Sequence, residues 1–91
     1  MRYVDLDNNT VYDTDSMRLV YEVYELYNNE ELVEGIYQSS DNRYFVIRKA
    51  YEDGSKSFRY ELRPTTEHYV KRTLAEEDID TYVQEFNPRI I

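Results

Sequence analysis

The sequence lacks several residue types on which common functions depend. Its 91 residues include no cysteine and no tryptophan, two glycines, two prolines and one histidine. Without cysteine the chain has no disulfide, no thiol nucleophile and no cysteine-ligated zinc. Two glycines cannot form a glycine-rich phosphate loop, and the single histidine, His68, has no nucleophile elbow or helical partner histidine. We therefore predict a protein that is not an enzyme and that binds no cofactor or metal.

Long apolar runs are also missing. No stretch approaches the ~18 apolar residues of a membrane-spanning helix, and Met1–Asp5 lacks the charged-then-apolar order of a secretory signal. These absences predict a cytoplasmic protein with no membrane contact. A chain of this length is expected to form a single domain, residues 1–91, which buries about 60–65% of the surface of its unfolded chain and has a small core.

Acidic residues outnumber basic ones, and the two kinds are sorted along the chain. Residues 1–41 contain ten acids and two bases, residues 42–74 eight bases and four acids, and residues 75–91 five acids and one base, for a net charge of −8. This charge opposes direct binding to DNA, RNA or anionic lipid, because each phosphate contact works against the long-range field. A basic protein is the partner that fits better. The sorting is also compatible with acids and bases that pair inside the fold.

Tyrosine is the most abundant aromatic residue, with eleven tyrosines against three phenylalanines. A buried tyrosine needs a hydrogen-bond partner for its hydroxyl, so a small core cannot hold all these rings. Several are therefore expected at the surface. Two interpretations remain open, since tyrosine suits the half-buried face of a β-sheet, and exposed tyrosine among acids forms a recognition surface.

Most of the chain has the alternation and the turn residues of antiparallel strands. Asp-Asn-Asn at 7–9 and Asp-Gly at 53–54 are turn signals. The predicted strands are Tyr3–Leu6, Thr10–Asp13, Leu32–Ser39, Arg43–Ala50 and Lys56–Arg63, with a turn at Ser40–Asn42. Pro64 is expected to end the last strand, because proline has no N–H for a ladder and restrains the residue before it.

Residues 17–27 are ambiguous between helix and strand. Polar residues recur there at helical spacing, at Arg18, Glu22, Glu25 and Asn29. Valine and tyrosine, which favour strands, fill many of the other positions. The residues alone leave the choice open.

The C-terminal part predicts a helix. Thr73 is placed to cap it, and Glu76 stands three residues on, as in a capping box. Apolar side chains then recur along one stripe before Pro88, at Ile79, Tyr82, Val83 and Phe86. Residues 68–74 are expected to form a strand or a connector. The predicted fold is α+β, an antiparallel sheet of about four to six strands arranged as hairpins, with one C-terminal helix packed on it.

Two dense acidic clusters are the candidate partner-binding residues. The first consists of Glu30, Glu31 and Glu34, and the second of Glu76, Glu77, Asp78 and Asp80. Each is compatible with a solvated face, and the second also with acids that complement the dipole at a helix start. Carboxylates a few Å apart on a rigid scaffold also resemble a row of phosphates, which recur every ~3.4 Å along a DNA strand. Base-like stacking surfaces would then come from Tyr21, Tyr24 and Tyr27.

Four short motifs follow one another in an order that resembles a known group of proteins. They are Val-Tyr-Asp-Thr-Asp at 11–15, Glu-Gly-Ile-Tyr-Gln-Ser at 34–39, Asn-Arg-Tyr-Phe-Val at 42–46 and Thr-Leu-Ala-Glu-Glu at 73–77. In this order the chain is similar to small uncharacterised proteins carried by phages and plasmids of Gram-positive bacteria, a group that includes candidate inhibitors of host defence nucleases. The resemblance implies a strand at residues 17–27 and an anti-CRISPR-like role.

Charge, composition and this resemblance lead to one hypothesis with one alternative. The first is a non-enzymatic acidic protein that binds a basic partner, most specifically an inhibitor that mimics nucleic acid in the DNA or RNA site of a bacterial nuclease such as a CRISPR effector. The alternative is a structural or oligomeric accessory protein, in which the basic strands of one copy meet the acidic ends of another.

Overall fold

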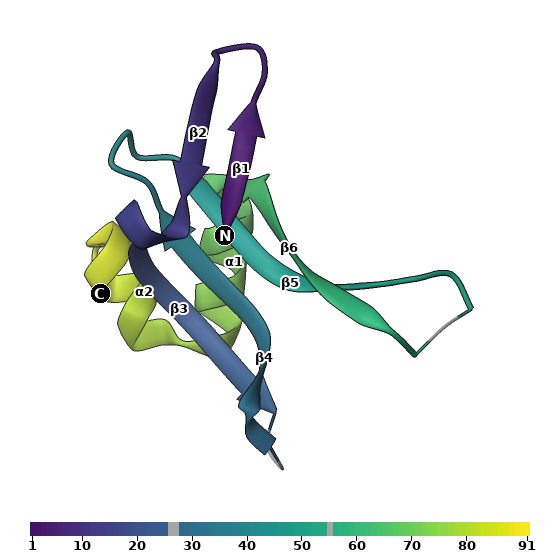
Figure 1. The fold of residues 1–91 in the computed structure, drawn as a ribbon. Coiled ribbons are helices and arrows are strands. Elements are labelled where there is room, and N and C mark those ends of the chain that lie inside the picture. The colour runs from purple at the N-terminus through teal and green to yellow at the C-terminus, as the bar shows by residue number, and fades with distance from the viewer. Residues whose placement is uncertain (26–27, 55) are drawn as a thin grey trace.

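The computed structural model describes residues 1–25, 28–54 and 56–91, with the backbone alone at 28–30. This part of the chain forms six strands and two helices (Figure 1). In chain order the elements are β1 (Arg2–Asp5), β2 (Thr10–Asp13), the 3-10 turn η1 (Thr14–Ser16), β3 (Arg18–Glu25), β4 (Asn28–Gln38), β5 (Tyr44–Tyr51), β6 (Phe58–Thr65), α1 (Glu67–Glu77) and α2 (Ile79–Phe86). The predicted α+β class is confirmed, and the prediction of a single helix is wrong.

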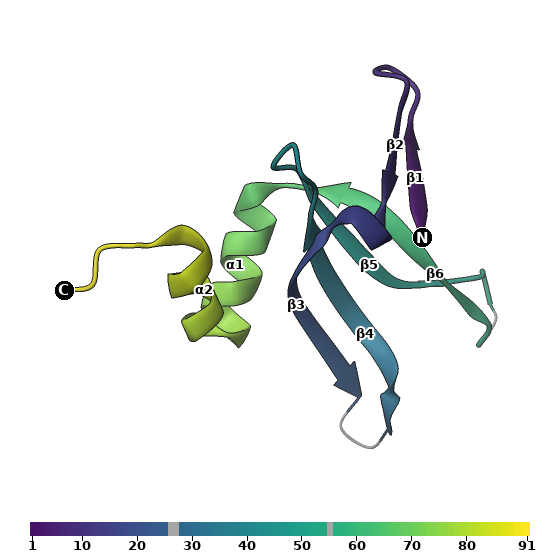
Figure 2. The same ribbon diagram turned by 60° about the vertical axis from the view of Figure 1, so that its left-hand side comes forward.

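The molecule has three layers around a four-stranded antiparallel sheet of order β3-β4-β5-β6. The β1-β2 hairpin lies on one face of this sheet and the two helices lie on the other (Figure 2). Because side chains alternate along a strand, successive residues of β5 serve the two layers. Phe45 packs with Tyr12 of the hairpin, at 4.8 Å between ring centroids, whereas Tyr44 packs with Val70 and Leu74 of α1.

Each face of the sheet therefore has its own small core. The buried residues on the hairpin side are Tyr12, Phe45, Ile47 and Leu62. Those on the helix side are Ile36, Tyr44, Val70 and Leu74. Val70 and Leu74 are four residues apart, so they lie on one face of α1 and both are fully inaccessible to solvent.

The five predicted strands are present, and Arg18–Glu25 of the ambiguous segment 17–27 form a sixth, β3, whereas residues 26–27 lie outside the described residues. The turns have the expected chemistry, because Asn9, Asn42 and Gly54 adopt the left-handed conformation at φ values of 47°, 67° and 69°. β3 pairs along its length with β4, so its valines and tyrosines contact a neighbouring strand rather than a helical turn. Pairing with β4, and not the helical spacing of the polar residues, therefore determines that this segment is a strand.

The predicted end of the last strand at Pro64 is wrong. β6 continues to Thr65, and Pro64 is paired with Phe45 of β5. β6 is the outermost strand of its sheet. An edge strand tolerates proline because one side of its backbone has no partner strand that needs the missing N–H.

The predicted helix start is also wrong. Residues 68–74 lie inside α1, whose N-cap is Thr66, and the Thr66 hydroxyl accepts a hydrogen bond of 3.0 Å from the Tyr69 N–H. Thr73 is therefore in the helix interior. Asp78 separates the two helices, since its N–H donates to the Leu74 carbonyl and its carboxylate accepts from the Thr81 N–H. Neither helix of the described chain is long and apolar enough to cross a membrane.

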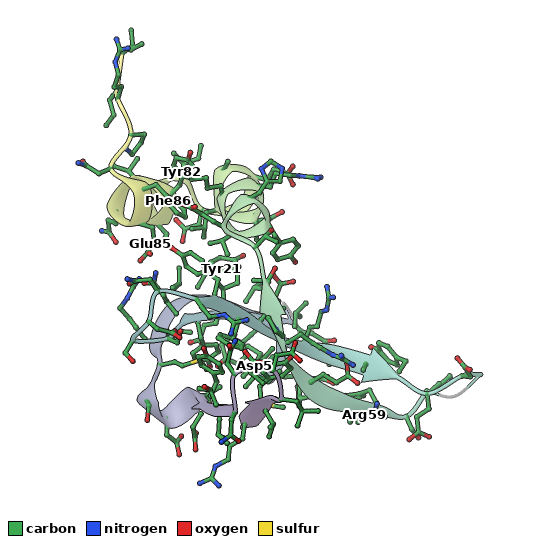
Figure 3. The ribbon with its side chains drawn as sticks, turned by 90° about the horizontal axis from the view of Figure 1, so that it is seen from above. Asp5, Tyr21, Arg59, Tyr82, Glu85 and Phe86 are labelled. Carbon is green, nitrogen blue, oxygen red and sulfur yellow. The ribbon has the colours of Figure 1, made fainter. Side chains whose placement is uncertain are left out.

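Only part of the predicted apolar stripe is packed. Phe86 lies 5.2 Å from Tyr82 and 6.3 Å from Tyr44 between ring centroids, and Val83 is half-buried. Ile79 is 67% exposed, contrary to the prediction. The short helix α2 begins at this residue, and the i,i+4 pair Tyr82 and Phe86 faces the sheet and α1 instead (Figure 3).

Candidate functional site: an acidic groove

A groove opens between the sheet and α1 on the helix side of the molecule. It has a volume of about 330 Å³. Its lining residues are Tyr21 and Val23 of β3, Val33 and Glu34 of β4, and Thr73, Glu76 and Glu77 of α1. We call this the acidic groove, because its apolar floor is bordered by three carboxylates.

A bulge in β4 shapes the floor of the groove. Val23 is paired with Glu34 and Tyr24 with Leu32, so Val33 is an extra residue with no partner opposite it. A bulge of this kind re-aims the neighbouring side chains. As a result, the consecutive residues Val33 and Glu34 both line the acidic groove, although residues next to each other in a regular strand face opposite ways.

Glu34 is fixed by a tyrosine from the helix. The Tyr69 hydroxyl donates to the two carboxylate oxygens of Glu34 at 2.9 and 3.0 Å. Burial and this hydrogen bond both raise the pKa of Tyr69, while the positive charge of Arg48 works in the opposite direction. The phenol therefore stays protonated at neutral pH and holds the carboxylate in one orientation.

The surroundings of Tyr21 indicate that the acidic groove has a negative electrostatic potential. Its ring lies between the sheet and the helices (Figure 3). Its pKa is raised, first by burial and then by the negative charges of Glu77, Glu34 and Asp78. Acids that lie far apart in the sequence thus act on one phenol, and a cation placed there would meet an attractive field.

Glu76 and Glu77 occupy an unfavourable position on their helix. The prediction assigned them to the first turn of a helix, where acids are stabilising, but they lie in the last turn of α1, which contains no basic residue. The helix dipole disfavours a negative charge there by about 0.3–1 kcal/mol at low ionic strength. The stability of α1 therefore does not account for these two glutamates.

Many other acids are neutralised inside the fold, so part of the charge sorting is internal pairing. The Lys49 ammonium lies 2.5 Å from Glu31 and 3.5 Å from Glu25, and Arg18 of β3 is paired with Glu85 of α2. The three glutamates of the acidic groove differ. Within the described residues, no lysine or arginine nitrogen lies within 4.0 Å of their carboxylates.

The structure brings together four of the predicted partner-binding residues. These are Tyr21, Glu34, Glu76 and Glu77. Asp78 lies close enough to influence Tyr21, but its carboxylate is engaged as the cap of α2. Asp80 is exposed in the first turn of α2.

The other predicted residues lie elsewhere. Glu31 is bound to Lys49. Tyr24 is on the opposite face of the sheet from Tyr21, because a spacing of three places side chains on one face of a helix but on two faces of a strand. Tyr27 and the side chain of Glu30 lie outside the described residues.

Sequence reasoning missed Val23, Val33, Tyr69 and Thr73. The valines read as ordinary strand residues, and only the bulge turns Val33 toward the acidic groove. Tyr69 and Thr73 lie four residues apart on α1 and would have been visible as a face of a helix that began at residue 67.

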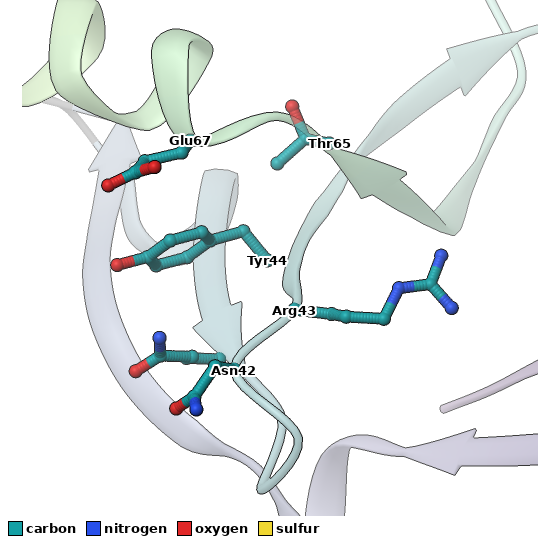
Figure 4. Close-up of a pocket in the computed structure, with 6 residues that line it drawn as sticks. Asn42, Arg43, Tyr44, Thr65 and Glu67 are labelled. Atoms are coloured by element: carbon teal, nitrogen blue, oxygen red, sulfur yellow. The ribbon is translucent and has the colours of Figure 1, made fainter.

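A second cavity of about 350 Å³ lies near the start of α1 (Figure 4). It is lined by Gln38, Asn42, Arg43, Tyr44, Thr65 and Glu67. The guanidinium of Arg43 points away from Tyr44 and Asn42 and is bound to Asp5 and to the Tyr12 hydroxyl. The positive charge of Arg43 therefore lies on the hairpin face of the sheet, where Asp5 neutralises it.

The acidic groove combines negative charge with apolar side chains. It offers three carboxylates, one phenol, one threonine hydroxyl and valine methyl groups. Across the described part of the chain, no three acidic or histidine side chains are grouped so that they could hold a metal ion. No protein-family model matches the chain, and no curated protein or solved structure is significantly similar to it.

Proposed function

We propose that this protein is a non-enzymatic binding protein whose acidic groove receives a basic segment of a partner protein. The observation that carries the proposal is that, within the described residues, no lysine or arginine nitrogen lies within 4.0 Å of the groove carboxylates, two of which lie in the last turn of α1, where the helix dipole disfavours them. Unpaired like charges on a rigid scaffold raise the local concentration of a cationic partner. The valine floor adds apolar contact for the stem of a lysine or arginine side chain.

A narrower form of the proposal concerns the kind of partner. A cytoplasmic bacterial nuclease such as a CRISPR effector binds its DNA or RNA in a basic channel. A compact acidic surface with a phenol between carboxylates is complementary to such a channel, so the protein would act as an inhibitor that excludes nucleic acid. The net charge of −8 supports steering toward a basic surface.

The salt dependence of binding tests the general proposal. The probe is a fluorescein-labelled octalysine peptide, with binding followed by fluorescence anisotropy. Because the groove acids are near the surface, affinity is expected to fall roughly tenfold or more between ~0.05 and ~0.5 M salt, as the screening length shortens. Binding that does not change with salt would contradict the proposal.

The inhibitor form needs a competition assay. An RNA-guided nuclease of a Gram-positive bacterium is incubated with the protein before its target duplex is added. Inhibition is expected to decrease as the duplex concentration rises, because protein and DNA would compete for one basic channel. Inhibition that is independent of duplex concentration would exclude nucleic-acid mimicry and leave the general proposal standing.

One observation favours the alternative, self-association. Three arginines are exposed on β5 and β6, namely Arg48, Arg59 and Arg63. They lie on the same face of the sheet as the acidic groove, because Leu62, next to Arg63 in β6, belongs to the core on the hairpin face. Arg59 and Arg63 share Glu61, which leaves this surface with excess positive charge. We call it the basic arm, and Figure 3 shows Arg59 on its outlying part. In a two-fold dimer the basic arm of each copy would meet the acidic groove of the other.

A further inference from the structure

A second surface lies on the face of the sheet opposite the acidic groove. The β1-β2 hairpin packs on this face around Phe45, and a row of aromatic side chains from all four strands of the sheet shares the face. We call this row the aromatic strip. Its members are Tyr24 of β3, Tyr37 of β4, Tyr51 of β5, and Phe58 and Tyr60 of β6.

Contacts establish that these rings share one face. Tyr37 and Tyr60 pack against the core that contains Phe45, and Tyr24 is paired with Leu32 of that same core. Phe58 lies 5.6 Å from Tyr60 and 5.9 Å from Tyr51 between ring centroids. Tyr24 is 39% exposed, Phe58 39% and Tyr51 62%. Exposed aromatic groups gathered in this way are typical of an interaction surface.

The same face already binds two of its own cations, each between a ring and a carboxylate. The Arg43 guanidinium carbon lies 5.0 Å from the centroid of Tyr12, and the group is bound to Asp5 at 3.1 Å. The Lys49 ammonium lies 4.5 Å from the centroid of Phe58 and 2.5 Å from Glu31. In both cases an aromatic ring attracts the cation and a carboxylate neutralises it, so the same arrangement occurs twice on this face.

Tyr24 and Glu22 form a third ring and carboxylate of this kind at the surface. The Tyr24 hydroxyl donates to Glu22 Oε2 at 3.1 Å, and both side chains are exposed. Chiefly through this hydrogen bond, the pKa of Tyr24 is raised, so the phenol remains a donor at neutral pH. Within the described ranges, no lysine or arginine is paired with Glu22 or stacked on Tyr24.

Gly35 keeps the neighbouring surface flat. It is the strand partner of Glu22, and a Cβ atom at this position would lie 3.1 Å from Cε2 of Tyr37. The glycine therefore lets the Tyr37 ring lie low across the strand. A flat aromatic floor beside an exposed carboxylate suits a planar guanidinium, which stacks on rings and binds carboxylates at the same time.

We propose that the aromatic strip is a docking surface for an arginine-bearing segment of a partner protein, with the guanidinium between the Tyr24 ring and the Glu22 carboxylate. Charge distinguishes this occupant from others. Glu22, Glu25 and Glu31 border the strip, and Lys49 is already bound to two of them, so two copies that faced each other through this strip would bring like charges together. Phosphate groups of single-stranded nucleic acid would be repelled in the same way. The surface is independent of the acidic groove, which lies on the other face of the sheet.

The test is an NMR titration with two matched peptides, acetyl-Gly-Arg-Gly-amide and the same peptide with neutral citrulline. Saturable shifts of the Tyr24 ring and Glu22 signals are expected with arginine and not with citrulline. Tyr24→Leu is expected to weaken binding about two- to fivefold, the range for one exposed cation–ring contact. Glu22→Gln should weaken it by a similar factor, whereas Asp15→Asn, which removes one charge from an exposed residue elsewhere, should leave it unchanged.

The position of the shifts separates this inference from the proposed function. Shifts confined to Thr73, Glu76 and Glu77 would overturn the aromatic strip as a docking surface and leave the acidic groove in place. Equal shifts with citrulline, or equal affinities for wild type and Tyr24→Leu with its dispersed folded spectrum retained, would also overturn it. The inference would also be overturned if an oligothymidine shifted the signals of the aromatic strip more strongly than the arginine peptide does, because the rings would then stack on nucleic-acid bases.

Discussion

Glutamates of identical chemistry have different roles in this protein, and their neighbours decide which. The bond to Lys49 lowers the pKa of Glu31 and raises that of Lys49, so this pair belongs to the fold. Glu34 accepts from a neutral phenol, and Glu76 and Glu77 lie at the negative end of the α1 helix dipole. Glu34, whose strand partner is Arg48, is thus oriented by the phenol, and Glu76 and Glu77 are exposed, so the acidic groove keeps the accessible carboxylates that the proposed binding of a cationic partner requires.

Titration of Tyr69 tests the contact between the sheet and α1. Removing the carboxylate with Glu34→Gln is expected to lower the pKa of Tyr69, because the acceptor charge contributes to its elevation. Carbon-13 NMR of the tyrosine Cζ atoms measures this, with Glu52→Gln as the control. A phenol whose pKa is raised on folding contributes stability that is complete below the unfolded value of about 10 and is lost as pH rises through the folded value. An unchanged Tyr69 titration would mean that the contact is absent in solution.

Asp78 and Asp80 test the cap between the helices. Asp78→Ala should lower the urea midpoint at neutral pH more than Asp80→Ala, because only Asp78 accepts hydrogen bonds from Thr81. These bonds lower the pKa of Asp78, so its contribution is present above the unfolded value and is lost as pH falls through the folded one. The difference between the variants should therefore shrink in acid. Equal midpoints at neutral pH would contradict the assigned cap.

Strands and helices differed in how well the sequence predicted them. The five predicted strands were located correctly, apart from their bounds, because alternation and Asn or Gly turns are local signals, whereas residues 17–27 stayed ambiguous. Helix bounds were wrong because Thr73 and Glu76 imitate a capping box, while the true caps, Thr66 and Asp78, lack the glutamate that would have marked them. Pairing with β4 and the bulge at Val33 depend on long-range contacts that no local pattern reveals.

Alanine variants of Leu74 and Ile79 test which side chains hold the helices against the sheet. Leu74 is fully buried against the sheet, so Leu74→Ala should cost roughly 2–5 kcal/mol of unfolding free energy. Ile79→Ala should cost less than about 1 kcal/mol, because this side chain is mostly in solvent. Urea unfolding of the two variants measures the difference. Similar losses would show that α1 is not the helix that anchors the layer.

At the scale of the whole molecule, charge is arranged by surface rather than by stretch of sequence. The first acidic cluster divides between Glu34 in the acidic groove and Glu31 in an ion pair, whereas Glu76 and Glu77 of the second cluster join Glu34. The sequence identified these acids and Tyr21 as candidates. The sequence could not predict that these residues lie close together, because their proximity depends on α1 lying across β3 and β4.

Self-association is tested by light scattering at several salt concentrations. If the basic arm of one copy binds the acidic groove of another, a dimer is expected at micromolar concentration in low salt. It should dissociate as the Debye length falls from ~10 Å at 0.1 M to ~3 Å at 1 M. Arg59→Glu with Arg63→Glu should abolish it. A monomer at low salt and high protein concentration would remove this alternative.

The most direct test of the acidic groove is charge reversal with a control of equal net charge. Glu76→Lys with Glu77→Lys alters the groove, and Glu52→Lys with Asp53→Lys alters an exposed turn, so each double variant changes the net charge from −8 to −4. Lysines in the last turn of α1 suit the helix dipole, so folding is not expected to suffer. Association with the octalysine peptide should slow roughly tenfold or more for the groove variant and by less than about twofold for the control. Equal association rates for the two variants would contradict the acidic groove as the binding site.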